Sequence, residues 1–155
     1  MRDGDGIAAE GIGAAREARL RESFATQGLM RHLGVEMVAL RRGEAVLRLP
    51  FRRELTQHHG YFHGGATSAL ADTAGGYAGC SVLPQGMTVL TVEFKLNLLS
   101  PGQGDFLEAA GRVIRPGRTL IVCQLDVWSA GRGERKHVAT GMQTLMAVPD
   151  RPAAG

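Results

Sequence analysis

The segment around His63, Gly64 and Gly65 combines residue types that suit hydrolytic chemistry. The two glycines open an Ala- and Leu-rich stretch that predicts a helix, and the first N–H groups of a helix have no partner within it. These N–H groups and the helix dipole favour a bound anion or an oxygen atom on which negative charge develops. Glycine lets a substrate come close to this backbone. Further along the predicted helix, Asp72 adds a carboxylate.

The spacing between the two groups limits how they could work together. Asp72 lies eight residues after Gly64, which is about 12 Å along a helix that rises about 1.5 Å per residue. One carbonyl carbon therefore cannot contact both groups of the same helix. The spacing favours a dimer whose site combines the helix start of one subunit with the Asp of the other.

Two segments together resemble a known family. Gln57 to Tyr77, and the strand Thr88 to Ser100 with its Ser-Pro-Gly ending, are similar to the hotdog-fold acyl-CoA thioesterases of the phenylacetate-degradation (PaaI-like) group. The similarity extends over most of residues 33–148. The resemblance implies hydrolysis of acyl-CoA thioesters to free CoA and a carboxylic acid, without a metal or cofactor.

The resemblance also implies the roles of the first residues described. Asp72 would be the nucleophile that attacks the thioester or the general base that activates water. Gly64 and Gly65 would donate backbone N–H groups to the thioester oxygen. Taken without the resemblance, Asp72 also fits a solvent-facing helix position, and the glycine pair fits a plain helix start.

Three further residues have supporting roles by the same resemblance. His63 would shape the turn by hydrogen bonding, and Gln57, where the family often has Asn, would orient the carbonyl or water. Thr91 would orient the hydrolytic water. Strand alternation places Thr91 opposite Leu90 and Val92, so it reaches the site only if the strand is irregular or lies at a subunit boundary. Cross-strand packing is the alternative for Thr91.

Aromatic and basic residues are candidates for substrate binding. Tyr61 and Phe62 could line a pocket for an apolar acyl group of modest size, or could belong to the core. Arg115 and Arg118 lie at a predicted turn and could bind the phosphates of coenzyme A, since a guanidinium suits phosphate. Solvated turn charges are the alternative for these arginines.

The sequence lacks the motifs that are typical of other catalytic chemistries. His58, His59 and His63 show no HExxH spacing and fit solvated loop histidines, so we expect no metal. No G-x-S-x-G segment is present around Ser68 or elsewhere. The fold alone also allows a protein that binds or senses acyl-CoA without hydrolysis. A hydratase or dehydratase is less favoured, because the His-rich segment lacks the prolines usual in those enzymes.

Composition fits one domain. The chain has 155 residues, 44% of them hydrophobic, which is enough for a core. We expect residues 1–13 to be a flexible tail and residues 14–150 a single domain. The net charge of +3 and the few aromatic residues do not favour nucleic-acid binding. No apolar run of about 18 residues and no secretory signal are found, so we expect no membrane span and a cytoplasmic location.

The order of elements predicts an α+β hotdog fold, in which an antiparallel sheet wraps around one long central helix and an N-terminal helix precedes it. We expect helices at 14–33 and 65–83, and strands at 35–40, 44–50, 87–99, 106–115, 119–129 and 136–148. Gly75, Gly76 and Gly79 interrupt the second helix, so a sheet must pack closely against it. The resemblance implies a homodimer or a homotetramer with active sites between subunits.

Overall fold

The computed structural model describes residues 11–131 and 133–151. Residues 1–10 of the expected tail lie outside this range. The elements are α1 (Ala14–Thr26), α2 (Gly28–Leu33), β1 (Glu36–Arg41), β2 (Glu44–Pro50), a short 3₁₀ helix (Arg53–Leu55), α3 (Gly64–Val82), β3 (Met87–Leu98), β4 (Phe106–Pro116), β5 (Leu120–Gly131) and β6 (Glu134–Pro149).

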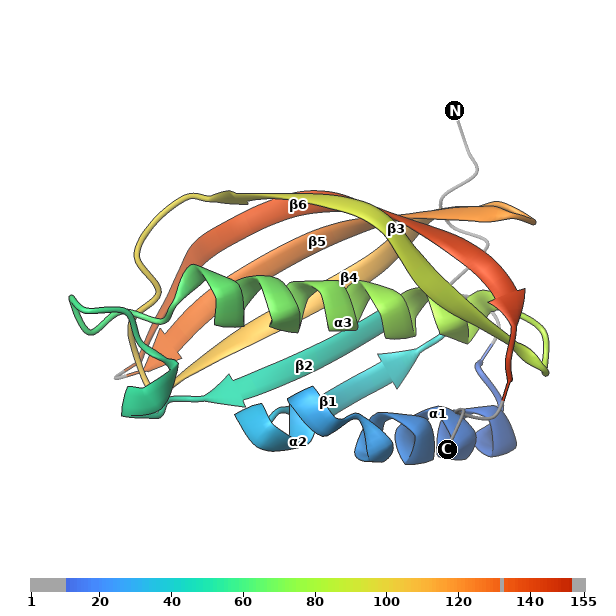
Figure 1. Ribbon diagram of the computed structural model, residues 1–155, viewed down its shortest axis with the longest axis horizontal. Coiled ribbons are helices and arrows are strands. Elements are labelled where there is room, and N and C mark those ends of the chain that lie inside the picture. The colour runs from blue at the N-terminus through green and yellow to red at the C-terminus, as the bar shows by residue number, and fades with distance from the viewer. Residues whose placement is uncertain (1–10, 132, 152–155) are drawn as a thin grey trace.

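The strands form a six-stranded antiparallel sheet in the order β1-β2-β4-β5-β6-β3. The long helix α3 lies across this sheet, and α1 and α2 lie beside β1 (Figure 1). This arrangement confirms the predicted α+β hotdog architecture. Within the described range, no helix is long and apolar enough to cross a membrane.

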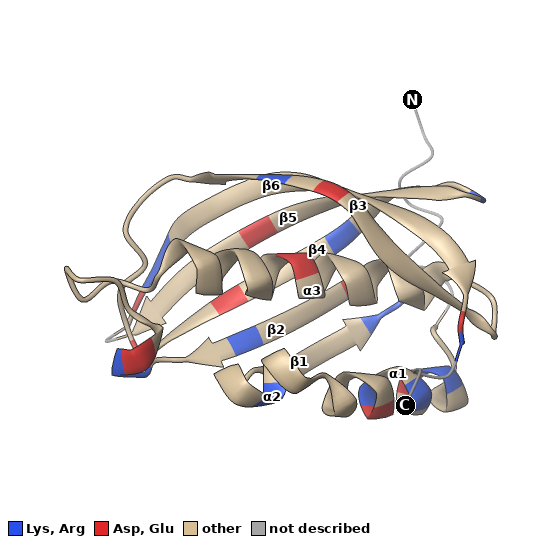
Figure 2. Ribbon diagram, in the orientation of Figure 1, with Lys and Arg blue, Asp and Glu red and all other residues tan. Residues whose placement is uncertain are grey.

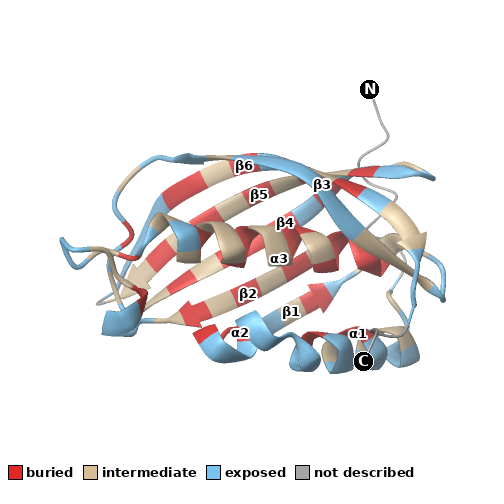
Figure 3. Ribbon diagram, viewed as in Figure 1, coloured by how far each residue is buried: buried red, intermediate tan, exposed pale blue. Residues whose placement is uncertain are grey.

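The core lies between α3 and the central strands. Side chains of β2 and β5 alternate between buried and less buried positions, as expected for strands with one covered face. Their buried residues, such as Leu47 and Leu125, face the buried Leu70 and Ala74 side of α3. Figure 3 shows this contrast, with buried bands along the central strands and a mostly exposed β3.

Two glycines allow α3 to approach the sheet closely. A Cβ atom added at Gly111 of β4 would overlap the backbone of Ala74 and Gly75. One added at Gly75 would overlap the side chains of Gln143 and Leu125. The close packing that we expected from the glycines in this helix is therefore present at Gly75.

The first predicted helix is wrong as a single element. The structure divides it at Gln27, whose backbone is extended with φ −69° and ψ 111°. Gly28 follows directly, and its low helix propensity explains why the helix ends here. The break turns α2 so that Met30 and Leu33 are buried.

The predicted alternation of β3 also needs correction. Regular alternation would turn Leu90 and Val92 toward α3 and Thr91 away from it, but the pairing with β6 shifts between Thr91 and Glu93. The shift is a β-bulge, which inserts one extra residue into the strand and reverses the alternation around it. Thr91 is paired with Leu145 and Leu96 with Gly141. Since Leu145 and Gly141 both lie on the buried face of β6, Thr91 points toward α3, as Leu96 does.

The adjacent glycines of α3 should respond in opposite ways to the same substitution. Gly75→Ala is expected to lower the free energy of unfolding by about 1–3 kcal/mol, because the added methyl overlaps Gln143. Gly76→Ala should raise it by up to about 1 kcal/mol, because Ala favours the helix and no atom lies within 4 Å of the new Cβ. Urea denaturation of both variants measures the difference, and equal effects would contradict this account of the packing.

Candidate active site

Asp72 is the only charged residue of α3, and Figure 2 shows the acidic band partway along this helix. Its carboxylate is half-buried and accepts two hydrogen bonds at Oδ1. Thr91 Oγ1 donates one at 2.8 Å and Gln143 Nε2 donates the other at 2.6 Å. No hydrogen bond to Oδ2 is found among the described residues. One carboxylate oxygen is thus fixed while the other is available for chemistry.

Gln143 comes from the middle of β6 and is completely buried. Its Nε2 also donates to the Asp72 backbone oxygen at 3.1 Å and lies 3.2 Å from Thr91 Oγ1. The side chain reaches α3 because Gly75 has no side chain in its path. The Oε1 atom of Gln143 has no hydrogen-bond partner within the described residues. Gln143 therefore connects the helix, the carboxylate and β3.

Sequence reasoning missed Gln143, although a signal existed. Burial alternates along β6 from Thr140 to Met146, and Gln143 falls on the same face as Leu145. A polar residue at a core position needs a hydrogen-bond partner. In the structure this partner is Asp72, the only charged residue on the central helix. Thr91, in contrast, was identified, and the bulge explains how it reaches Asp72.

The start of α3 is organised by His63. Its Nδ1 accepts a hydrogen bond from the Gly65 N–H at 2.8 Å, so His63 is the N-cap of the helix. This bond occupies the Gly65 N–H, which we expected to contact the substrate. For the Gly64 N–H, the described residues provide no acceptor. Unlike the Gly65 N–H, the Gly64 N–H is therefore a free donor at this helix start.

Gln57, Tyr61 and Phe62 lie around the same helix start. Together with Gly64 they line a cavity of about 400 Å³, whose other wall includes Leu98. The Gln57 side-chain oxygen accepts from the His59 N–H, which fixes it in the loop. Phe62 is buried and packs edge-on against another aromatic ring, so it also belongs to the core.

Asp72 and Thr91 line a different cavity. This groove of about 470 Å³ runs between α1, α3 and the first part of β3. It shares no lining residue with the cavity at Gly64. The structure therefore brings Thr91 to Asp72, and Gln57, Tyr61 and Phe62 to Gly64, but it does not bring these two groups together within one chain.

Buried groups near the groove have shifted acidities. Burial raises the pKa of Tyr77 and of the Cys80 thiol, both of which line the groove. Burial also raises the pKa of Cys123 to about 12. Both cysteines are free thiols, and neither is a thiolate nucleophile at neutral pH.

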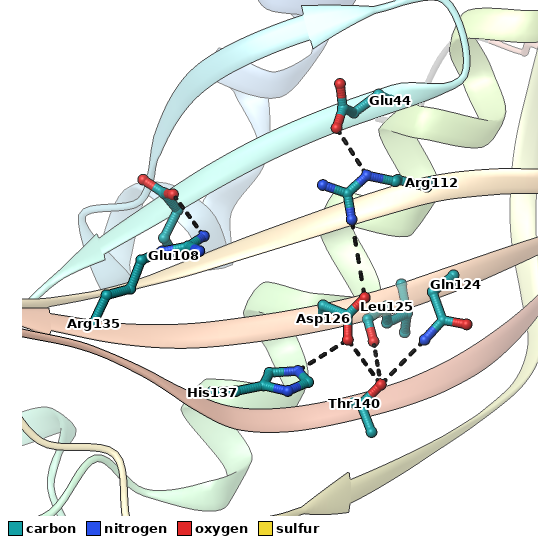
Figure 4. A network of polar contacts seen from close by, with 9 residues as sticks. All are labelled: Glu44, Glu108, Arg112, Gln124, Leu125, Asp126, Arg135, His137 and Thr140. Carbon is teal, nitrogen blue, oxygen red and sulfur yellow. Dashed lines mark hydrogen bonds and ion pairs between the residues drawn. The ribbon is translucent and has the colours of Figure 1, made fainter.

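The outer face of the sheet holds a network of charges (Figure 4). Arg112 contacts Glu44 at 3.0 Å and Asp126 at 3.9 Å, and Asp126 also accepts from His137. Arg135 lies 3.7 Å from Glu108. These arginines are thus committed to carboxylates, and this network lies away from the two cavities.

Arg115 and Arg118 differ from these network arginines. Both are exposed at the connection from β4 to β5, and neither forms an ion pair with any described residue. They line neither the groove at Asp72 nor the cavity at Gly64. Their guanidinium groups are consequently available to an anionic ligand at the surface.

Comparisons with known proteins identify relatives. Residues 59–136 match the family model described as the thioesterase superfamily. The crystal structure of a thioesterase family protein from Silicibacter pomeroyi is 40% identical, covers 86% of this chain and 98% of its own, and has a TM-score of 0.84. A candidate esterase from Halobacterium salinarum is 37% identical over 90% of this chain and 98% of its own length. The acyl-coenzyme A thioesterase PaaI of Escherichia coli is 30% identical over 61% of this chain and 66% of its own length.

Proposed function

Because the chain belongs to the thioesterase superfamily, we propose that it hydrolyses acyl-CoA thioesters to free CoA and a carboxylic acid. The resemblance to the PaaI-like group that its motifs indicated is confirmed. A thioester hydrolase is the activity that the family supports, and acyl-CoA is the substrate class that the name of the Escherichia coli relative suggests. The observation that carries the proposal is the Asp72 carboxylate held at one oxygen beside an open groove.

Asp72 drives the reaction in this proposal. Thr91 and Gln143 hold Oδ1, which leaves Oδ2 to attack the thioester carbonyl directly or to take a proton from an attacking water. In either case the carbon–sulfur bond breaks, the hydroxyl of water ends on the acyl carbon and its proton ends on the CoA thiol. Holding one oxygen fixes the carboxylate orientation, which lowers the entropic cost of reaching the reactive geometry.

Asp72 should be indispensable for turnover. Asp72→Asn keeps the size of the side chain but removes the nucleophile or base, so kcat should fall by about 10³ or more. Thiol release from short, medium and aromatic acyl-CoA thioesters measures the rate. Ser68→Ala, on the same helix, is the control and should retain activity. A protein that binds acyl-CoA yet shows no turnover would be a sensor, and the thioesterase proposal would be wrong.

The Gly64 N–H is the proposed donor to the thioester oxygen as charge develops on it. It cannot serve the Asp72 of its own chain, because eight residues of helix separate the two by about 12 Å. We therefore place Gly64 of one copy beside Asp72 of a second copy. Gln57, Tyr61 and Phe62 would approach the substrate together with Gly64.

The edge strand β3 supports a dimer. It has a neighbour on only one side in the described sheet, and its side chains include Leu90, Phe94 and Leu98, which are 61%, 39% and 59% exposed. A long apolar edge strand left in water invites pairing with another chain. Pairing of β3 with a second β3 would cover it and place two sites near the interface, and a tetramer would add contacts between dimers.

Two substitutions at Gly64 separate the loss of the backbone N–H from the effect of an added side chain. Gly64→Pro removes the N–H and keeps the backbone path, because Pro fits the first helical position and the preceding His63 is extended. Both Pro and Ala add a Cβ, which lies 3.1 Å from Leu98 Cδ1. Gly64→Ala keeps the N–H and serves as the control. Relative to Gly64→Ala, kcat of Gly64→Pro should fall by about 10² to 10³. Equal rates of thioester hydrolysis would exclude this donor.

The same variants test the shared site. Subunits with Gly64→Pro and subunits with Asp72→Asn are inactive alone, but a mixed dimer contains one intact site. Random mixing should restore about one quarter of the wild-type rate in a symmetric dimer. No recovery after verified subunit exchange would place the complete site within one chain.

Arg115 and Arg118 are the proposed contacts to the CoA phosphates, because they are exposed and without a described carboxylate partner. The double variant Arg115→Gln with Arg118→Gln should raise KM for acyl-CoA by about tenfold or more, since each charged hydrogen bond contributes about 1.5–3 kcal/mol. It should leave hydrolysis of the matching acyl-pantetheine unchanged, because that substrate lacks the nucleotide. Arg31→Gln, at an exposed position of α2, is the control. Equal losses with both substrates would contradict the assignment.

A further inference from the structure

The groove beside Asp72 contains a glycine that the fold does not need. Gly76 follows Asp72 by one helical turn and lines the groove. Glycine in a helix interior is about 1 kcal/mol less favourable than alanine. Gly75 has a packing reason for this cost, but no atom lies within 4 Å of a Cβ added at Gly76. The missing side chain at Gly76 leaves open space next to the reacting carboxylate.

The charges around the groove indicate which part of a thioester fits there. The lining contains two cationic residues, Arg16 and Arg19, and three anionic ones, Glu22, Asp72 and Asp150. Arg16 already donates to the Cys80 carbonyl at 2.7 Å. This balance does not attract the phosphates of CoA. This charge balance suits the acyl group, which lies on the other side of the thioester sulfur from CoA, provided that the acyl group has no negative charge of its own.

Hydrogen-bonding groups dominate the wall that α1 and α3 share. The Tyr77 hydroxyl lies 3.2 Å from Ser23 Oγ and 3.3 Å from Gln27 Nε2, and all three residues line the groove. Phe24 packs edge-on against the Tyr77 ring, with 5.5 Å between ring centroids, and fixes its position. A plain alkyl chain lying here would cover the exposed polar atoms of Ser23 and Gln27 without replacing their hydrogen bonds to water, which is unfavourable.

Resting on the thioesterase function proposed above, we propose that the groove over Gly76 is the acyl site, that it takes an uncharged acyl group with a hydroxyl or carbonyl substituent, and that Tyr77 determines this specificity. The substrate class differs from the apolar acyl group expected from the sequence. The reason is that Tyr61 and Phe62 line the cavity at the helix start, whereas the groove at Asp72 is polar.

Filling the groove tests its assignment to the acyl group. In Gly76→Leu, kcat/KM for hexanoyl-CoA should fall at least about tenfold more than for acetyl-CoA, whose two carbons do not extend past Asp72. The Kd of free CoA, measured by calorimetry, should stay unchanged. Gly11→Leu, at an exposed glycine outside the groove lining with equally open surroundings, is the matched control and should affect neither substrate. A loss of CoA affinity as large as the loss of hexanoyl-CoA turnover would overturn the proposal.

Removing the hydroxyl of Tyr77 tests the proposed selectivity for an acyl group that carries a hydroxyl. The wild-type protein should hydrolyse 6-hydroxyhexanoyl-CoA about tenfold faster in kcat/KM than hexanoyl-CoA, which corresponds to one net hydrogen bond. Adipoyl-CoA, with a terminal carboxylate, should be the poorest of the three. In Tyr77→Phe the preference should be abolished, so that kcat/KM for 6-hydroxyhexanoyl-CoA equals that for hexanoyl-CoA in the same variant.

Two kinds of failure are distinguishable. Turnover of all three thioesters at equal kcat/KM, or a preference that persists in Tyr77→Phe, would overturn the inference while the thioesterase function stands. No turnover of any thioester by the wild-type protein would overturn the thioesterase function, and the inference with it.

Discussion

The hydrogen bonds of Gln143 to Asp72 connect the sheet to the central helix at that helix's only charged residue. They depend on a short distance between α3 and the sheet, which Gly75 and Gly111 make possible. A buried amide and a half-buried carboxylate would each be costly alone, and together they satisfy one another. The packing of α3 against the sheet and the orientation of the proposed catalytic carboxylate therefore depend on the same hydrogen bonds. A change that moves α3 away from the sheet would free the carboxylate and lose its orientation at the same time.

The bulge in β3 complements this contact from the other side. The extra residue, Val92, lets Thr91 and Phe94 both face the helix, although they are three residues apart. Thr91 thereby donates to the carboxylate oxygen that Gln143 also contacts. Beyond the bulge, Phe94 and Leu98 face the helix side but remain largely uncovered at the sheet edge. The bulge thus directs Thr91 to Asp72, and it also sets the direction of the apolar side chains at the sheet edge that a second copy could cover.

Much of this arrangement could be predicted from local sequence. Strand alternation, turn residues and the glycine-rich helix gave the order and type of most elements, because each of these signals acts within a few residues. Gly28 weakens the middle of the first predicted helix, but the break at Gln27 was not predicted, since helical spacing continues across Gly28. The direction of Thr91 depended on a bulge, which has no clear sequence pattern. Gln143 was missed because its partner lies 71 residues away in the chain, and such contacts are set by the fold rather than by neighbouring residues.

Gly75 and Gly76 are neighbours in the chain but have opposite relations to the rest of the molecule. At Gly75 any side chain would meet the sheet, whereas at Gly76 it would meet empty space. Evolution can therefore change the volume at position 76 without a loss of stability, and the requirement for glycine at position 75 keeps the carboxylate in place. Under the proposed mechanism, a thioesterase built this way could acquire new substrates through a single position while its fold and the Asp72 carboxylate are inherited unchanged.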